Sequence, residues 1–421
     1  MINPQSIFIL IILIIVGSFL LETILSFLNA TRFSFPLPER LAGIYDAEKY
    51  NTYQQYLKAK HRFSMLNDAF SFVVILVMLL LGGFVWADEM SRYLLQSPIL
   101  QSLLFFGILG LGYDILGMPF DIYFTFRIEQ RFGFNTTTPR TFILDKLKSW
   151  LLGIILGGGI LSIIVLIYLK TGNWFWIIAW GVISLFSVFM SMFYSNLIVP
   201  LFNKQKPLEA GELRSKIEAF ANTIGFKLNN IYVIDGSKRS KKSNAYFTGI
   251  GPKKRIVLYD TLIEENSPEE LVAVLAHEMG HYKLKHTLQG LIISLLSTGL
   301  TLWILSLFLQ YAVFTQALGF AIPSFQAGLI AFGMLFTPIS LVTGVLSSML
   351  SRKNEYAADR FACLNYKPQA LATALINLSR NNMSNLFPHP STVFLYYSHP
   401  PLMQRLAKID EVTEQESPTL A

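Results

Sequence analysis

The sequence is poor in cysteine and in charged side chains. Among its 421 residues there is a single cysteine, Cys363, and only 14% are Asp, Glu, Lys or Arg. One cysteine excludes a disulfide framework and a zinc site built from thiolates, so Cys363 is expected to be a small buried apolar residue. The low charge, beside 52% hydrophobic residues, excludes an ordinary soluble enzyme and indicates a protein with many membrane spans.

Seven stretches of the chain are apolar over about the 20 residues that a helix needs to cross a bilayer. They comprise residues 7–28, 69–86, 99–120, 150–169, 174–198, 288–309 and 325–350. The first stretch is longer than the core of a signal peptide, has no basic residue before it, and is not followed by a convincing cleavage site. We therefore expect it to be a membrane anchor.

Basic residues are nearly missing from every second connection between these spans. Of the 34 Lys and Arg, only Arg92 and Lys170 lie in the connections after the second and fourth spans, and residues 310–324 have none. The positive-inside rule then places the N-terminus outside, and the C-terminus with the soluble segment 199–287 on the cytoplasmic side. The net charge of +7 reflects this topology, so binding to nucleic acid is not expected.

One segment carries a pattern of metal-ligand residues. Residues 267–286 are expected to form one helix, with Ser267 as N-cap and Glu270 completing a capping box. The motif HEMGH at 277–281 places two histidines four residues apart on one helix face, where they can bind one Zn²⁺ ion. Glu278 is placed to take a proton from the attacking water. A surface helix that holds this pattern by chance is the alternative.

A zinc protease of this kind needs a third protein ligand, which has to come from elsewhere in the chain. Directly after the last span, Glu355 and Asp359 lie four residues apart on an expected helix. The spacing suits a ligand carboxylate followed by an Asp that accepts the free ring N–H of a ligand histidine, and it resembles thermolysin-type zinc proteases. A surface ion pair of Glu355 with Arg352 or Lys353 is the ordinary alternative. Both segments lie on the same side of the membrane, which favours the zinc protease.

The soluble segment is also expected to contain a short sheet. Residues 208–224 are typical of an amphipathic helix, residues 230–234 of a strand, and residues 245–247 with 255–259 of a hairpin. Metalloproteases bind peptides as an added strand along a sheet edge, so the hairpin is either such an edge or a plain scaffold. Near the N-terminus, residues 39–56 are expected to form an amphipathic helix at the membrane surface.

The chain is thus expected to have five parts. They are an N-terminal membrane region with five spans (1–198), the soluble segment with the edge strand and the HEMGH helix (199–287), the last two spans (288–350), a C-terminal segment with the third ligand (351–408) and a disordered tail (409–421).

At this level of detail the sequence resembles the integral-membrane CaaX prenyl proteases, which are seven-span zinc metalloproteases. The motifs that carry the resemblance are spread over nearly the whole chain. They are GFN at 133–135, PLFNK at 200–204, DGSKRS at 235–240, SNAYF at 243–247, RIVLYDTL at 255–262, HEMGH at 277–281, NEYAAD at 354–359 and SHPPLMQRL at 398–406. Family members often have a His in the loop where this chain has Ser-Lys-Lys-Ser at 240–243.

The resemblance implies an all-α polytopic membrane protein in which seven transmembrane helices form a barrel around a chamber, beside a small zinc-protease domain with a short sheet. It also implies a role for each candidate site residue. These roles are ligands of one Zn²⁺ per chain for His277, His281 and Glu355, the base for Glu278, oxyanion stabilisation for His399, support of the site for Asp359 and Arg405, and binding of the substrate backbone for Asn244, Ala245 and Tyr246.

The function implied by the resemblance is hydrolysis of extended peptides, above all C-terminal CaaX-type prenylated peptides, by a protein in contact with membrane lipids. One alternative is a quality-control protease that cleaves membrane chains without regard to a prenyl group. A remote alternative is a catalytically silent membrane scaffold, which would have no need of Glu278. The compact chain and the absence of an ER-retrieval ending favour a bacterial inner membrane, and the ER membrane is expected if the source is eukaryotic.

Overall fold

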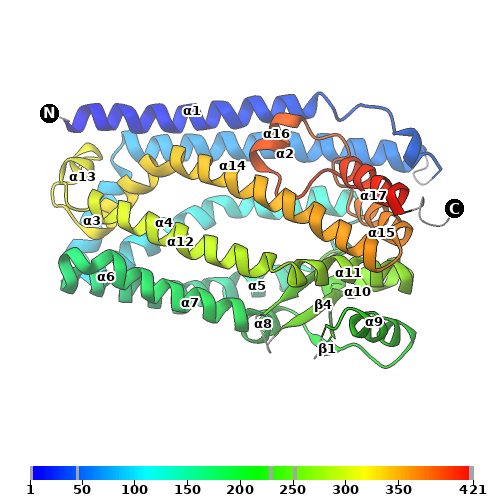
Figure 1. Cartoon of the computed structure of the whole chain (residues 1–421). Coiled ribbons are helices and arrows are strands. Elements are labelled where there is room, and N and C mark those ends of the chain that lie inside the picture. Colours follow the sequence, from blue (N-terminus) through cyan, green and yellow to red (C-terminus); the bar gives the residue numbers. More distant parts are fainter. Residues whose placement is uncertain (1–2, 44–46, 227–230, 250–253, 417–421) are drawn as a thin grey trace.

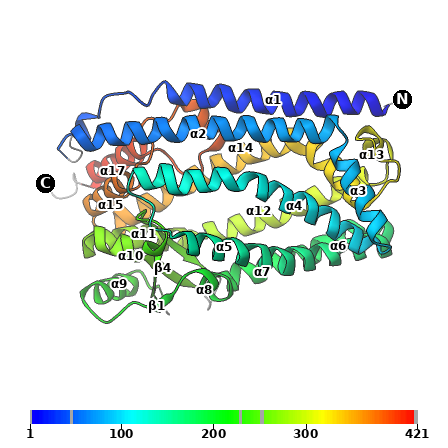
Figure 2. The ribbon, with the colours of Figure 1, turned by 180° about the vertical axis from the view of Figure 1, so that it is seen from behind.

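The computed structural model of the chain describes residues 3–43, 47–226, 231–249 and 254–416. Long helices run side by side along the molecule, and the two termini lie at opposite ends of the bundle (Figure 1). The sheet and most of the shorter helices lie toward the end that carries the C-terminus, and the view from behind shows the same division (Figure 2). The expected all-helical membrane region with a small sheet is therefore confirmed.

Within the described residues, six continuous helical segments are long and apolar enough to cross a membrane. The fourth of these segments, residues 139–202, contains two of the seven predicted spans, which are joined by a turn at η4 (Gly172–Trp174). The helices of the membrane region are α1 (Pro4–Ala30), α2 (Ala47–Leu80), α3 (Gly83–Leu94), α4 (Pro98–Tyr123) with its π-helical continuation η2 (Phe124–Glu129), α5 (Pro139–Leu152), the π-helical turn η3 (Gly153–Gly157), α6 (Gly158–Thr171), α7 (Phe175–Leu197), α12 (His286–Phe308), α13 (Val313–Ala317) and α14 (Phe325–Asn365).

Two expectations for the first third of the chain are wrong in detail. The predicted surface helix 39–56 is instead a short 3₁₀ turn, η1 (Glu39–Leu41), followed by the first turns of α2, and residues 44–46 lie outside the described part. The predicted span 69–86 ends at Leu80, because Gly82 adopts a left-handed conformation with φ of 71° and starts α3. Glycine takes this conformation without steric cost, so the helix can end here inside an apolar stretch.

The soluble part contains four strands, one more than the sequence predicts. Its elements are α8 (Val199–Phe202), β1 (Gln205–Pro207), α9 (Glu212–Thr223), β2 (Ile231–Ile234), η5 (Gly236–Lys238), β3 (Ala245–Thr248), β4 (Arg255–Tyr259), α10 (Asp260–Glu265) and α11 (Pro268–Lys283). The strand order is β1-β2-β4-β3, with β2 parallel to β4 and β3 antiparallel to β4. The predicted hairpin is present, and among the described strands β3 pairs with β4 alone, so β3 forms an edge of the sheet.

The predicted helix 267–286 is interrupted near its C-terminal end. Helix α11 ends at Lys283, and Lys285 takes a left-handed conformation with φ of 61° before α12 begins at His286. The chain changes direction there, so the HEMGH helix and the next membrane span are separate rods.

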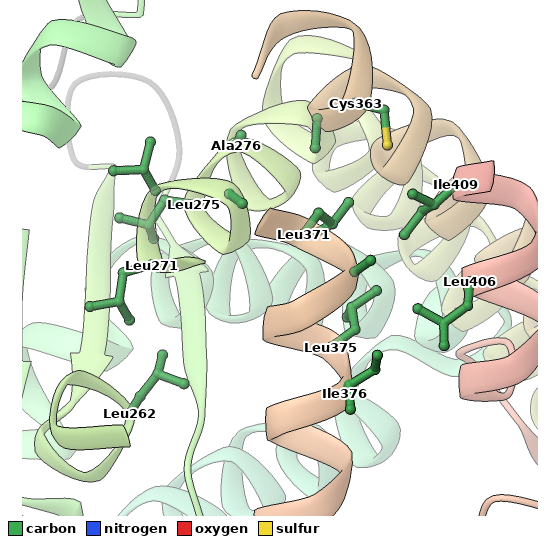
Figure 3. Close-up of a cluster of buried hydrophobic side chains, with 14 of the residues drawn as sticks. Leu262, Leu271, Leu275, Ala276, Cys363, Leu371, Leu375, Ile376, Leu406 and Ile409 are labelled. Atoms are coloured by element: carbon green, nitrogen blue, oxygen red, sulfur yellow. The ribbon is translucent and has the colours of Figure 1, made fainter. Parts of the chain in front are cut away.

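The C-terminal segment covers the end of the bundle with α15 (Pro368–Asn381), α16 (Pro390–Tyr396) and α17 (Leu402–Glu416). The prediction of a disordered tail is wrong for residues 409–416, which continue α17, while residues 417–421 lie outside the described part. Leu406 and Ile409 of α17 are buried, because they pack against α15 and α14 (Figure 3).

The largest hydrophobic core lies directly beneath the HEMGH helix. Figure 3 shows Leu271 and Leu275 of α11 directed toward the sheet side and Leu371 of α15 directed toward α11 and α14. Cys363 is 5% exposed in the same core, so it is the buried apolar residue that the sequence predicts. This packing fixes α11 against α14 and α15, the helices that complete the site.

Candidate metal centre and active site

The HEMGH helix is held at its N-terminus by the expected capping box. The Ser267 hydroxyl accepts a hydrogen bond from the backbone N–H of Glu270, and the Glu270 carboxylate accepts one from the N–H of Ser267 at 2.8 Å. Every residue from Leu271 to His277 is buried, so the helix is packed on nearly all sides before the motif begins. The motif therefore starts on a rigid element.

The structure brings His277, His281 and Glu355 together. The two Nε2 atoms are 3.2 Å apart, Glu355 Oε2 is 3.4 Å from His277 Nε2, and Glu355 Oε1 is 3.3 Å from His281 Nε2. Glu355 reaches them from α14, which packs against α11. Two imidazole nitrogens and the carboxylate of Glu355 thus converge from two helices, although Glu355 follows His281 by 74 residues.

This cluster has the properties of a metal site. Glu355 Oε2 is buried and accepts no hydrogen bond from the described residues, which is costly unless a cation lies against it. The facing ring nitrogens both have lone pairs to offer, and a proton shared between them would satisfy only one. The donor set therefore fits one metal ion held by His277, His281 and Glu355.

Asp359 and Arg405 fix the orientation of His277. Asp359 Oδ1 lies 2.8 Å from His277 Nδ1, so Nδ1 carries the proton and Nε2 is left for the cluster. Arg405 donates two hydrogen bonds to the Asp359 carboxylate, at 2.6 and 2.8 Å. Burial opposes protonation of the ring, but the nearby carboxylates of Asp359 and Glu355 raise the pKa of His277 to about 9. The surroundings are thus built for a positive charge at this position.

His286 fixes the ring orientation of His281 in the same way. The two Nδ1 atoms are 3.1 Å apart, so with Nε2 directed at the cluster the Nδ1–H of His281 donates to His286. The left-handed turn at Lys285 brings His286 back toward the motif. An ideal continuous helix would have placed His286 off the ligand face.

His399 completes one side of the cluster. It follows α16, and its Nε2 lies 3.3 Å from Glu355 Oε1, while its Nδ1 is within 2.9 Å of the Ser398 hydroxyl. Its side chain is 64% exposed, in contrast to the buried Glu355. An imidazole at this place can reach a group bound beside the metal ligands.

Glu278 faces a large cavity together with His281. The cavity has a volume of about 820 Å³, and α11, α12, α14 and β3 contribute to its wall. On the membrane side it is lined largely by small and hydroxyl-bearing residues. These are Gly290, Ser294 and Ser297 of α12 and Ser340, Thr343, Gly344, Ser347 and Ser351 of α14. The hydroxyl groups in this wall can hydrogen-bond to water or to a peptide inside an otherwise apolar bundle.

The edge strand β3 lies beside this cavity. Phe247 of β3 lines the cavity, whereas Tyr246 points to the opposite face of the sheet and packs with Val199 and Val257. Asn244 is exposed at the start of the strand, and its carbonyl accepts the backbone N–H of Tyr259. If Asn244, Ala245 and Tyr246 bind a peptide, Tyr246 has to do so through its backbone.

The sequence alone did not identify Phe247 or the small and hydroxyl-bearing residues of α12 and α14 that line the cavity. A signal was present, because residues 290, 294 and 297 and residues 340, 344, 347 and 351 are small or polar at helical spacing within apolar spans. Phe247 could have been placed by strand alternation, which puts residues 245 and 247 on one face of β3.

Two family models match the chain in succession. The model described as CAAX prenyl protease N-terminal, five membrane helices, matches residues 26–204, and the model of peptidase family M48 matches residues 207–413. The second match contains all the residues of the cluster.

Curated relatives resemble the chain over almost its full length. A CAAX prenyl protease 1 homolog of Arabidopsis thaliana is 35% identical over 410 residues, which cover 93% of this chain and 95% of the relative. CAAX prenyl protease 1 of Saccharomyces cerevisiae is 35% identical over 410 residues and 90% of each chain. The crystal structure of S. mikatae Ste24p matches with a TM-score of 0.91 and 33% identity, covering 97% of this chain and 100% of that chain.

Proposed function

Because the chain belongs to the CAAX prenyl proteases of peptidase family M48, and so is a membrane-embedded metalloprotease, we propose that it is a zinc endopeptidase that cleaves C-terminal prenylated peptides. The observation that carries the proposal is the convergence of His277, His281 and Glu355 at the wall of a cavity that Glu278 also lines. The curated relatives are named for CAAX prenyl processing, which supports the substrate class.

We propose Zn²⁺ as the ion because of the donor atoms and their spacing. Two imidazoles and one carboxylate with an open fourth position are a common ligand set of catalytic zinc. In a tetrahedron with bonds of about 2.1 Å the ligand atoms are about 3.4 Å apart. The two Nε2 atoms are 3.2 Å apart, and each lies 3.3 to 3.4 Å from one of the two oxygens of the Glu355 carboxylate, so the separations are close to this value. When bound, Zn²⁺ supplies Lewis-acid chemistry, polarising the scissile carbonyl and acidifying water.

The residues of the chain then divide the remaining work. Glu278 accepts a proton from the attacking water and passes it to the leaving amine, as a positioned general base and acid. His399 is placed to donate a hydrogen bond to the oxyanion that develops on the scissile carbonyl. Asp359, held by Arg405, keeps His277 in the tautomer that leaves Nε2 free.

The substrate is expected to enter as an extended chain. The edge strand β3 offers free backbone groups to a peptide, which can add to the sheet in the manner of a further strand. Side chains of β3 other than Phe247 do not face the cavity, so recognition through the backbone suits many sequences. A cavity of about 820 Å³ bounded by packed helices excludes folded proteins.

We further infer that the site lies on the cytoplasmic side. The soluble part carries the basic connections, and the positive-inside rule places such segments in the cytoplasm. The bacterial inner membrane stays a prediction from the sequence.

The proposal is tested with the purified full chain in detergent. The zinc content is measured, and a farnesylated CaaX peptide is incubated with the protein beside its unlipidated twin, with and without a chelator. We expect one zinc per chain and chelator-sensitive cleavage of the farnesylated peptide alone. Absence of bound zinc from active protein would contradict the assignment of the ion.

The same experiment separates the proposed function from its rival. Equal cleavage of both peptides would favour a quality-control protease that does not depend on a prenyl group. Zinc binding without cleavage of either peptide would contradict the proposed substrate class.

A further inference from the structure

A second cavity lies between α2 and the α4–η2 helix, away from the candidate active site. Its volume is about 940 Å³. Its wall contains three arginines, which are Arg62, Arg127 and Arg131, and several aromatic rings. Phe63 of α2 stacks on Tyr123 of α4 with the ring centroids 5.7 Å apart, which ties the two helices together at the bottom of the groove. We call these residues and their neighbours in the wall the α2–α4 groove.

The α2–α4 groove opens toward the bilayer and not toward the interior of the bundle. Arg62 lies on the same face of α2 as Leu66, Val73 and Leu80, which follow at helical spacing. These three side chains are 54% to 63% exposed, as expected of residues that face lipid. The opposite face of α2 is marked by Tyr53, which lies nine residues before Arg62, is buried, and accepts the backbone N–H of Leu386. Arg62 is therefore on the outer face of the helix.

The arginines lie where the apolar spans begin and end. Arg62 precedes the apolar stretch of α2 by about two turns, and Arg127 follows Tyr123 by four residues at the end of α4. Since α2 and α4 cross the membrane in opposite directions, both positions fall at the same membrane surface, the one with the basic connections. Lipid phosphates lie at this depth, and a long basic side chain there reaches the headgroup region.

The guanidinium groups of Arg62 and Arg127 make no ion pair or hydrogen bond with any residue in the described ranges. Within the described ranges, the Arg131 guanidinium makes a cation–π contact with the ring of Phe132, whose centroid is 5.3 Å from Cζ, and faces no carboxylate. Elsewhere on this side, arginines find carboxylates: Arg239, for example, binds Asp145 at 2.7 Å. An arrangement of unpaired arginines at one groove calls for an anion from outside the chain.

We propose that the α2–α4 groove binds an anionic phospholipid of the leaflet next to the active site. The guanidinium groups of Arg62 and Arg127 hold its phosphate, for which the planar fork of arginine is well suited. An acyl chain lies along the apolar wall at Leu66, Pro119 and Phe120. The apolar wall beside the charges favours a lipid over a free anion, because it can pack against an acyl chain and makes no favourable contact with inorganic phosphate.

The test measures lipid binding to the delipidated full chain in detergent by native mass spectrometry. Dioleoylphosphatidylglycerol is compared with dioleoylphosphatidylcholine and with inorganic phosphate. Each basic residue near an anionic lipid contributes roughly a fivefold preference, so we expect the double substitution Arg62→Gln/Arg127→Gln to weaken phosphatidylglycerol binding about 30-fold. The single substitution Arg62→Gln is expected to weaken it about fivefold, which keeps the test available if the double variant does not fold.

A matched variant controls for net charge. Arg140 and Lys206 are exposed and lie outside the groove, so Arg140→Gln/Lys206→Gln removes the same charge and is expected to leave phosphatidylglycerol binding within about twofold. An equal loss in this control would overturn the proposal, as would equal binding of the two lipids. Displacement of the lipid by inorganic phosphate at equal concentration would show a free-anion site and would also overturn it.

Discussion

At the scale of single residues, Glu355 is the buried negative charge of the site that most needs a positive charge beside it. Its carboxylate is 4% exposed and faces His277, His281, His399 and, at 3.8 Å, the Arg405 guanidinium. Buried carboxylates of this kind are stable only beside positive charge. The Glu355 carboxylate and the ring nitrogens of His277 and His281 offer ligand atoms to a cation. Asp359 binds the Arg405 guanidinium at two points and so keeps it from taking that place.

The residue that decides between a structural and a catalytic site is Glu278. The substitution Glu278→Gln keeps the size of the side chain and removes its ability to accept a proton. We expect the variant to retain its zinc, since Glu278 is not among the three clustered ligands, and to lose at least about 100-fold in the rate of peptide hydrolysis. Metal analysis and the cleavage rate are measured on the same preparation. Unchanged turnover would show that another group is the base.

The raised pKa of His277 leads to a prediction of how metal binding depends on pH. With the pKa of His277 raised to about 9, metal-free protein holds this proton at neutral pH, and the metal has to displace it. The apparent zinc affinity is therefore expected to rise with pH, by up to about tenfold per unit, until the pH reaches about 9. The stability of the metal-free fold is expected to change with pH in the opposite direction to the zinc affinity. The stabilisation that comes from the protonated ring of His277 is complete below pH 6.5 and is lost as the pH rises to about 9. Chelator competition between pH 6 and 8 measures the first effect, and a flat profile would refute it.

At the scale of elements, the site depends on how closely α11 approaches α14. Gly280 permits this approach, since a Cβ atom there would lie 3.0 Å from Phe361 Cδ1 and 3.3 Å from the Ala358 carbonyl oxygen. The backbone oxygen has no freedom to move aside without shifting α14. The glycine of the HEMGH motif therefore sets the distance between the helix with two histidines and the helix with Glu355.

We expect Gly280→Val to separate the two helices, to destabilise the fold by about 1–3 kcal/mol and to weaken zinc binding. Thermal unfolding and zinc content measure the two effects. Gly333→Val is the matched control, because a Cβ atom added at Gly333 of α14 would have no neighbouring atom within 4 Å, and it should change neither quantity. If Gly280→Val binds zinc as tightly as the unchanged protein, the helix spacing is not critical.

The elements also show which kinds of structure the sequence predicts. Spacing along one helix was sufficient for the capping box at Ser267, the histidine pair of the motif and the pairing of Glu355 with Asp359. The break at Lys285 was not predictable, because a non-glycine residue takes a left-handed conformation there and only the packing of two helices enforces it. Strand β1 was missed because it has three residues and ends in a proline, and short edge strands carry almost no pattern.

The error at the C-terminus has a different origin. Leu402, Leu406 and Ile409 recur at helical spacing, so an amphipathic helix was visible in the sequence. The acidic and Ser-Pro composition of the last residues outweighed this pattern in the prediction. Burial of Leu406 and Ile409 against α14 and α15 shows that tertiary contacts order the segment as far as Glu416.

At the scale of the whole molecule, polar contacts bind the membrane region to the protease region. Lys242, in the loop before β3, donates to Glu129 at 2.8 Å and to the Tyr56 hydroxyl at 2.9 Å, and Tyr56 donates to Glu129 at 2.6 Å. This loop is the one in which family members often carry a His. Here a lysine joins α2, η2 and the loop that leads into the edge strand.

We expect Glu129→Gln to destabilise the protein by about 1–3 kcal/mol, because the amide oxygen can accept from only one of the two donors, Lys242 and Tyr56, and the negative charge beside the Lys242 ammonium is lost. Adding Lys242→Met should restore part of the loss. The exposed pair Lys408–Glu411 is the control, and Glu411→Gln should stay within about 0.5 kcal/mol. Thermal unfolding of the four proteins in one detergent measures these differences, and equal effects at both pairs would argue against a special role of the buried one.

Helix α14 gives the whole molecule a mechanical property. Its 41 residues, with Pro338 among them, extend over about 60 Å, twice the thickness of the hydrocarbon layer of about 30 Å, so one continuous helix reaches from within the bilayer to Glu355. A thinner or thicker bilayer changes the tilt of such a rod, and a lever of this length converts a few degrees into a displacement of its far end. Helix α11 packs against the end of α14 that carries Glu355, so the two histidines are displaced together with Glu355. A change of membrane thickness is therefore expected to leave the ligand geometry intact, and the zinc content of the protein in vesicles should stay constant as the acyl chains are lengthened.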